Sequence, residues 1–186
     1  ISTMTISQSS FDCSHLGANT VTLTVTDASG NVSTCTSTVT VIDNMAPNAI
    51  CQDITVYLDA TGNATIDSTD TDNGSTDNCS IVTMSLSQTA FDCTHVGTNT
   101  VTVTVTDQSG NVSTCSSTVT VIDNVNPIAM CKDTTVYLDA AGNVSINTTY
   151  VDNGSSDACA FTLTLSDTAF TCADAGVNAV TLTVTD

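Results

Sequence analysis

Nine cysteines are the residues of this chain with the most direct chemistry, because a thiol can form a disulfide or bind a metal. No two of them stand in the Cys-Xaa-Xaa-Cys spacing of zinc and redox sites, so we expect disulfides formed in an oxidising, extracellular setting. The central part of the chain holds four cysteines, and four cysteines allow three pairings. They are Cys51, Cys79, Cys93 and Cys115.

A hairpin turn expected at residues 107–111 excludes one of these pairings. It sets Cys115 opposite about residue 102, which leaves Cys93 roughly 30 Å away at about 3.3 Å per residue and excludes a Cys93–Cys115 bond. We expect the first strand of the repeat to lie beside the last, and therefore favour three pairs, Cys51 with Cys115, Cys79 with Cys93, and Cys159 with Cys172. Cys51 is out of phase with the apolar residues after it, so its pair requires a bulge or a strand that changes sheets. Three cysteines have no expected partner in the sequence: Cys13, Cys35 and Cys131.

Aspartate provides the second kind of chemistry. All 19 acidic residues are Asp, against the single cation Lys132, and the net charge of -18 excludes nucleic acid as a partner. The loop 70–78 places oxygen-bearing side chains around a glycine, as in calcium sites, and the linker residues Asp43 and Asn44 are expected to face it. The competing interpretation is that these residues only form turns.

The calcium hypothesis covers two equivalent junctions, where the ion would stiffen the array. Its expected ligands are Asp43, Asn44, Asp72, Asn73 and Asp77 at the first junction, and Asp123, Asn124, Asp152, Asn153 and Asp157 at the second.

Catalysis is not expected. The two histidines, His15 and His95, occupy equivalent positions, but Asp174 replaces them in the next copy of the pattern. The sequence holds no nucleophile elbow, phosphate loop or histidine triad, so we expect no enzyme activity and surface-loop histidines.

These residues recur because the chain is a tandem repeat. The segment Thr40-Val-Ile-Asp-Asn44 returns as Thr120-Val-Ile-Asp-Asn124, which gives a period of 80 residues. The expected organisation is the C-terminal part of an Ig-like repeat in residues 1–45, a complete repeat in 46–125 and the N-terminal part of a third in 126–186. We expect the sequence to belong to a much longer polypeptide, with neither end a natural terminus.

Strict alternation predicts the strands that must position these residues. Residues 99–107 place valines on one face and threonines on the other, and 112–122 is the expected return strand. A similar turn at 59–63 separates 54–58 from 64–66, and helix signals are absent. The expected fold is all-β, a disulfide-stapled Ig-like sandwich of seven strands or fewer per repeat. In the third repeat we place a one-residue deletion after Ala160, which keeps its apolar face in register.

Several segments together resemble a known repeat class. They are Ala49-Ile-Cys-Gln-Asp-Ile-Thr-Val56, Asp72-Asn-Gly-Ser-Thr-Asp-Asn-Cys79, Phe91-Asp-Cys93 and Thr106-Asp-Gln-Ser-Gly-Asn-Val-Ser-Thr-Cys115. The pattern resembles the hyalin-type (HYR-like) Ig-fold repeats of giant Bacteroidetes surface proteins, including SprB-type gliding adhesins. The resemblance implies export by a type IX secretion system and a cell-surface filament, extracellular in location.

Two functions are expected to compete. The first is structural, a stalk or filament segment of a large secreted adhesin for gliding or surface attachment, whose partners are the neighbouring repeats and other copies in a filament. The alternative is a repeat-borne binding module for glycans or for other filament chains. No apolar run reaches the roughly 20 residues of a membrane span.

Overall fold

The computed structural model describes residues 1–186, and strands make up most of its regular structure. The fold is all-β, with Ig-like sandwich repeats and three disulfides, as the sequence predicts. Its contacts divide the chain into two units, and the division passes through strands β8 and β9. One unit comprises Ile1–Gln52, Asp67–Ser87 and Val101–Ser117; the other comprises Asp53–Ile66, Gln88–Thr100 and Thr118–Asp186.

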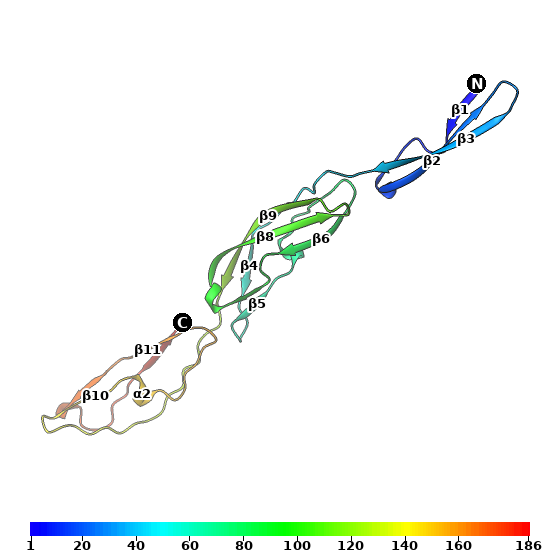
Figure 1. Cartoon of the computed structure of the whole chain (residues 1–186). Coiled ribbons are helices and arrows are strands. Elements are labelled where there is room, and N and C mark those ends of the chain that lie inside the picture. Colours follow the sequence, from blue (N-terminus) through cyan, green and yellow to red (C-terminus); the bar gives the residue numbers. More distant parts are fainter. The chain divides into compact units, whose positions relative to one another are not determined.

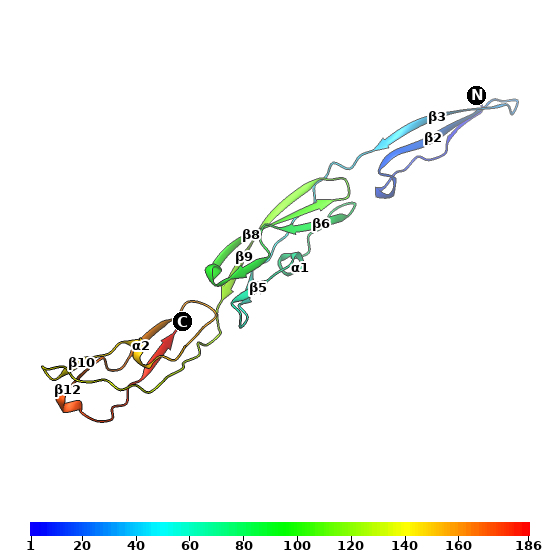
Figure 2. The same ribbon diagram turned by 60° about the horizontal axis from the view of Figure 1, so that its bottom comes forward.

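The first unit begins with a three-stranded antiparallel sheet in the order β1-β2-β3. Its elements are β1 (Thr3–Ile6), the 3-10 turn η1 (Cys13–His15), β2 (Gly17–Thr26) and β3 (Val32–Val41). The unit also contains α1 (Ser68–Thr71) and β6 (Ile81–Leu86), which contact each other (Figure 2).

The second unit contains short strands, most of them in two-stranded sheets. Its elements from the middle repeat are β4 (Ile54–Tyr57), β5 (Asn63–Thr65), β7 (Ala90–Asp92) and η2 (Cys93–His95). Those of the third repeat are β10 (Asn143–Ser145), α2 (Thr148–Val151), β11 (Thr162–Leu165), β12 (Ala169–Thr171), η3 (Cys172–Asp174) and β13 (Leu182–Thr185). The pairs β5–β7 and β10–β12 are antiparallel and have equivalent registers, Ala64 opposite Phe91 and Val144 opposite Phe170.

The middle repeat is built on the four-stranded sheet β4-β9-β8-β6, coloured cyan to yellow-green in Figure 1. The central strands β8 (Gly97–Asp107) and β9 (Val112–Ile122) flank the predicted turn. Strand β4 pairs with β9 in parallel, Ile54 opposite Val119, and the two-stranded sheet β5–β7 completes the repeat.

The core follows from the alternation of β8 and β9. Five valines are fully buried, and the intervening threonines of β8 are partly exposed on its other face. Each buried valine stabilises the fold by roughly 1.5 to 3 kcal/mol relative to an exposed one. These valines are Val101, Val103, Val105, Val119 and Val121.

A change of pairing partner before β4 explains why Cys51 is out of phase with the apolar residues that follow it. Cys51 forms an isolated antiparallel bridge with Asp72, whereas the chain from Ile54 onward pairs with β9. Between these pairings the Ser117 hydroxyl donates to the Gln52 carbonyl at 2.7 Å. The segment therefore changes its pairing partner between Cys51 and Ile54, which serves the same end as the change of sheet that the sequence allowed.

The turn at 59–63 is present but does not form a hairpin. Asp59 N–H donates to the Asn63 carbonyl at 2.8 Å, and Gly62 has a positive φ of 76°. The strands on either side join different sheets, because β4 pairs with β9 and β5 pairs with β7. The turn therefore connects the two layers of the sandwich.

Two helical turns, α1 and α2, depart from the expectation that helices are absent. Asp67 caps α1 by accepting from Thr69 N–H at 2.7 Å, and Asn147 caps α2 by accepting from Thr149 N–H at 3.0 Å. Each helix is a single turn of four residues, too short for a periodic apolar pattern.

The deletion in the third repeat coincides with a β-bulge in the second. In β6, Ile81 lies opposite Asp107 and Thr83 opposite Thr106, so Val82 is the extra residue. In β11, Leu163 lies opposite Val184, the pairing equivalent to Met84 with Val105. Removing a bulge residue leaves the downstream register unchanged, and Leu163 stays packed against the core as predicted.

Candidate functional site

Three disulfides connect the chain, and two of them join successive repeats. They are Cys13–Cys79, Cys51–Cys115 and Cys93–Cys159, with sequence separations of 66, 64 and 66 residues. The Cys51–Cys115 bond is the one that the sequence predicts. The predicted pairs Cys79–Cys93 and Cys159–Cys172 are wrong, and Cys13, for which no partner was expected, is bonded to Cys79. Cys35, Cys131 and Cys172 are free and exposed.

The length of β8 explains the error. Ile81, two residues after Cys79, lies opposite Asp107 at the end of β8, whereas Cys93 precedes the start of that strand. An eleven-residue strand is about 35 Å long at about 3.3 Å per residue, far beyond disulfide reach. Cys79 therefore bonds with a cysteine of the preceding repeat, and Cys93 with one of the following repeat.

Each junction cysteine on the N-terminal side lies in a capped 3-10 turn. In η2 the Asp92 carboxylate accepts from Thr94 N–H at 2.9 Å, and the His95 ring contacts the same carboxylate at 2.8 Å. His95 also packs edge-on against Phe91, with ring centroids 5.7 Å apart. Hydrogen bonds from Thr94 and His95 lower the pKa of Asp92. The histidine therefore closes a cap.

The same cap explains why a histidine can be replaced in the third repeat. In η3 the Asp174 carboxylate accepts from Thr171 N–H at 2.8 Å, and the Thr171 hydroxyl accepts from Ala173 N–H at 3.2 Å. In η2 the acid is the capping residue before the turn, whereas in η3 the acid is the last residue of the turn. The turn and its cysteine nevertheless occupy the same position in both repeats. Cys172 accordingly occupies the position of Cys93, with its sulfur 3.7 Å from the Gly142 carbonyl.

Gly62 allows the junction disulfide to lie against the β4–β5 turn. A Cβ at this position would lie 2.8 Å from Cys93 Sγ and 3.3 Å from the Ala158 carbonyl oxygen. Gly62 also has the positive φ that disfavours other residues. The turn and the disulfide therefore require glycine for separate reasons.

An acidic cluster lies within the first unit, beside the Cys13–Cys79 junction. Carboxylate oxygens of Asp43, Asp77 and Asp107 lie within 4.8 Å of one another. The sequence places Asp43 in the linker, Asp77 two residues before Cys79, and Asp107 at the end of β8. Like charges at this separation repel, and the repulsion is stronger where water is excluded.

Two of these carboxylates have one oxygen occupied and one without a donor. Asp43 Oδ1 accepts from Met45 N–H at 3.1 Å, and Asp77 Oδ2 accepts from Cys79 N–H at 2.8 Å. Asp43 Oδ2 and Asp77 Oδ1 are buried and have no hydrogen-bond partner. Buried polar atoms without partners are rare and costly, and oxygen-only clusters suit calcium. The residues present therefore fit a divalent cation.

Asp107 and Asn111 fix the third side of the cluster. Asp107 is only 3% exposed, and its two oxygens accept from the backbone and side-chain nitrogens of Asn111, each at 2.7 Å. Burial by itself would raise the pKa of Asp107. The hydrogen bonds that its carboxylate accepts, above all from Asn111, nevertheless lower this pKa below its ordinary value. The Asn111 amide also lies 3.2 Å from the Asp43 carbonyl and 3.0 Å from the Met45 carbonyl, and so ties the linker to the turn.

The cluster contains only part of the predicted ligand set. Asp72 accepts from Ser75 N–H at 3.0 Å and Asp152 from Ser155 N–H at 2.9 Å, and serine hydrogen bonds lower the pKa of each. These two aspartates form turns away from the cluster, as the competing interpretation proposed. The asparagines of the predicted set are exposed and also lie outside the cluster: Asn44, Asn73, Asn124 and Asn153.

The second junction has an equivalent cluster of side chains with fewer carboxylates. Asp123, Asp157 and Cys159 lie within 4.8 Å, and the buried Asp157 Oδ1 has no partner. Cys159 is bonded to Cys93, so its sulfur is not a thiolate ligand. Two predicted ligands are thus brought together here, with one carboxylate fewer than at the first junction.

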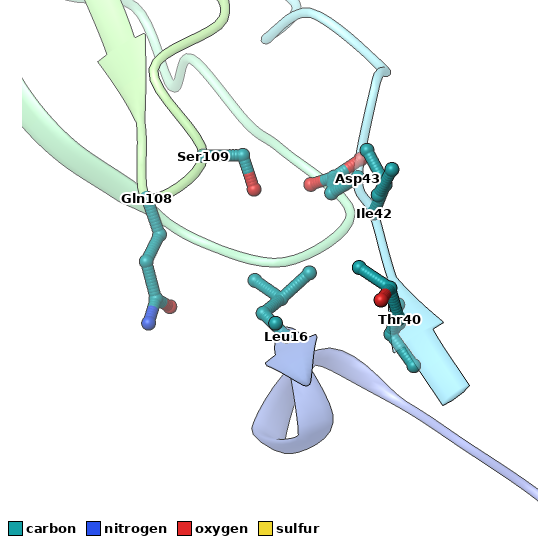
Figure 3. A pocket seen from close by; sticks show the side chains of 8 residues that line it. Leu16, Thr40, Ile42, Asp43, Gln108 and Ser109 are labelled. Atoms are coloured by element: carbon teal, nitrogen blue, oxygen red, sulfur yellow. The ribbon is translucent and has the colours of Figure 1, made fainter. Parts of the chain in front are cut away.

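A groove of about 380 Å³ opens beside Asp43, between the end of β3 and the turn after β8. Leu16 and Ile42 provide apolar walls, and Asp43, Gln108 and Ser109 provide polar ones (Figure 3). Sequence reasoning missed Asp107 and Asn111 as site residues, although both recur as Asp27 and Asn31.

Comparisons with known proteins give one distant structural similarity. No family model and no curated protein matches the chain. Among solved structures, the chain is similar to the extracellular cadherin domains 1–4 of protocadherin gamma B7, with 14% identity and a TM-score of 0.36. The match covers 100% of this chain and 58% of that one, so this chain spans a little over half of the structure it matches. None of its helices is long and apolar enough to cross a membrane.

Proposed function

We propose that this chain is a structural stalk segment of a large secreted cell-surface adhesin. The observation that carries the proposal is the pair of equivalent disulfides, Cys13–Cys79 and Cys93–Cys159, which join each repeat covalently to the next. Covalent links between successive repeats keep a stalk continuous along its length, in an array where each repeat contacts only its neighbours.

The proposed setting is the surface of a Bacteroidetes cell, with export by a type IX system and a part in gliding or attachment. The resemblance to HYR-like repeats supports this setting, and the three disulfides favour an oxidising, extracellular compartment. The proposal includes no catalytic role, since the caps of η1 and η2 account for the two histidines.

We also propose that calcium is a structural cofactor of the first junction, held by Asp43, Asp77 and Asp107. The buried oxygens without donors support this assignment, because a divalent ion would satisfy both and neutralise the repulsion. Calcium would join the linker to the loop before Cys79 and to the end of β8, and so hold one repeat against the next.

Imaging of intact cells tests the stalk. Antibodies against this chain, applied to unpermeabilised cells that produce it, should label thin surface threads in electron micrographs, and pre-immune serum should not. Labelling that requires permeabilisation, or that marks isolated particles without threads, would contradict the proposal.

A further inference from the structure

The connectivity of the junction disulfides determines which part of the chain carries tension. Cys79 and Cys93 belong to the same repeat, but Cys79 is bonded to the repeat before and Cys93 to the repeat after. The residues between Cys13 and Cys79, and those between Cys93 and Cys159, therefore form closed loops, each spanning a separation of 66.

We propose that the chain is a tether in which tension bypasses most of each sandwich. A force applied outside Cys13 and Cys159 follows the shortest covalent path between them. This path crosses the first junction disulfide, follows the backbone from Cys79 to Cys93, and crosses the second junction disulfide. The Cys51–Cys115 bond lies off the path.

The path is short compared with the chain. Cys13 and Cys159 are 146 positions apart (159 minus 13), and a fully extended chain of that length measures about 500 Å at about 3.5 Å per residue. Cys79 and Cys93 are 14 positions apart (93 minus 79), which corresponds to about 50 Å.

The backbone part of the path also has little slack. It contains β6, with six residues, and β7, with three, so most of it is already in strand conformation. A strand advances about 3.3 Å per residue, against a maximum of about 3.6 Å, so further stretching gains only about a tenth of its length. The valines of β8 and β9 that form the core lie off the path.

Single-molecule stretching of the whole 186-residue chain, held by enzymatic tags at its termini, tests this inference. Under oxidising conditions we expect no unfolding step from the region between Cys13 and Cys159. The double substitution Cys93→Ser with Cys159→Ser should add a release on the order of 200 Å. The shortest covalent path then runs from Cys79 back to Cys51, crosses the Cys51–Cys115 bond and follows the backbone to residue 159.

The matched control removes the disulfide that lies off the path. Cys51→Ser with Cys115→Ser should lower the melting temperature without adding a release, since neither residue carries tension. The inference is overturned if the oxidised parent chain releases hundreds of ångströms, or if the control variant lengthens as much as the junction variant. The inference rests on the proposed stalk, but the two experiments fail independently. Surface threads could be seen on cells even if the stretching result were negative, and the stretching result could be positive even if no threads were seen.

Discussion

Asp43 is the residue at which the calcium proposal can be tested most cleanly. Its Oδ2 is buried without a donor, whereas Asp72, also expected to be a ligand, accepts from Gly74 and Ser75 N–H groups in a turn. We expect calcium to raise the melting temperature of the parent chain by roughly 2 to 8 °C per kcal/mol of binding free energy. Asp43→Asn should remove most of this rise, and Asp72→Asn should keep it.

The measurement is differential scanning calorimetry in calcium and in chelator. Magnesium provides an ionic control, since it tolerates an irregular all-protein site less well than calcium does. Equal melting temperatures of the parent chain in calcium and chelator would remove the metal from the proposal and leave Asp43 as a linker turn residue.

Asn111 is expected to stabilise the junction through its side-chain amide. Asn111→Ala removes the contacts with the Asp43 and Met45 carbonyls, as well as the bond to Asp107. Asn31→Ala is the matched control, because Asn31 binds Asp27 in the equivalent turn. With about 0.5 to 1.5 kcal/mol for each hydrogen bond, Asn111→Ala should cost about 1 to 3 kcal/mol more than its control in urea unfolding. Equal losses would show that Asn111 stabilises only its own turn.

The sequence could identify some of the site residues but not their grouping. Asp43 and Asp77 were expected to be ligands and are brought together, whereas Asp107 was interpreted only as a turn residue. Oxygen-bearing side chains around a glycine are as typical of an Asx turn as of a calcium loop, which is why Asp72 was misplaced. Only the folded chain shows which turn the linker touches.

At the scale of elements, strict alternation predicted β8 and β9 with their turn, because a buried face of valines specifies both strand and register. The arrangement of the short strands could not be predicted in this way. The residues of β4 and β5 flank a turn of hairpin type, yet they join different sheets. Local turn chemistry sets the direction of the chain, whereas the choice of sheet depends on distant partners.

The bulge in β6 predicts that the repeat tolerates the deletion of one residue at this point. Deletion of Val82 should cost less than about 1 kcal/mol, because Val82 is 61% exposed and the third repeat keeps the same register with one residue fewer at this point. Deletion of Thr104 should prevent folding of the repeat, since it would turn the valines of β8 toward solvent. Circular dichroism melting of the two deletion variants compares them. A cooperative melt for both, or for neither, would contradict the register assignment.

At the scale of the whole molecule, the sequence predicted a disulfide-stapled tandem array but placed the staples within repeats. Four cysteines per repeat satisfy a pairing inside one repeat as well as a pairing across junctions, so counting cannot distinguish them. The length of β8 decides, because it separates Cys79 from Cys93.

The three disulfide loops also overlap along the sequence, since Cys51 precedes Cys79 and Cys93 precedes Cys115. Every peptide bond between Cys13 and Cys159 therefore lies inside at least one loop. A protease that cuts the backbone once in this region leaves a nicked molecule, still in one piece. After limited digestion, singly cut chains should migrate together on a non-reducing gel and separate on a reducing one. A polymer of such repeats would therefore keep its covalent continuity after single backbone cuts in different repeats.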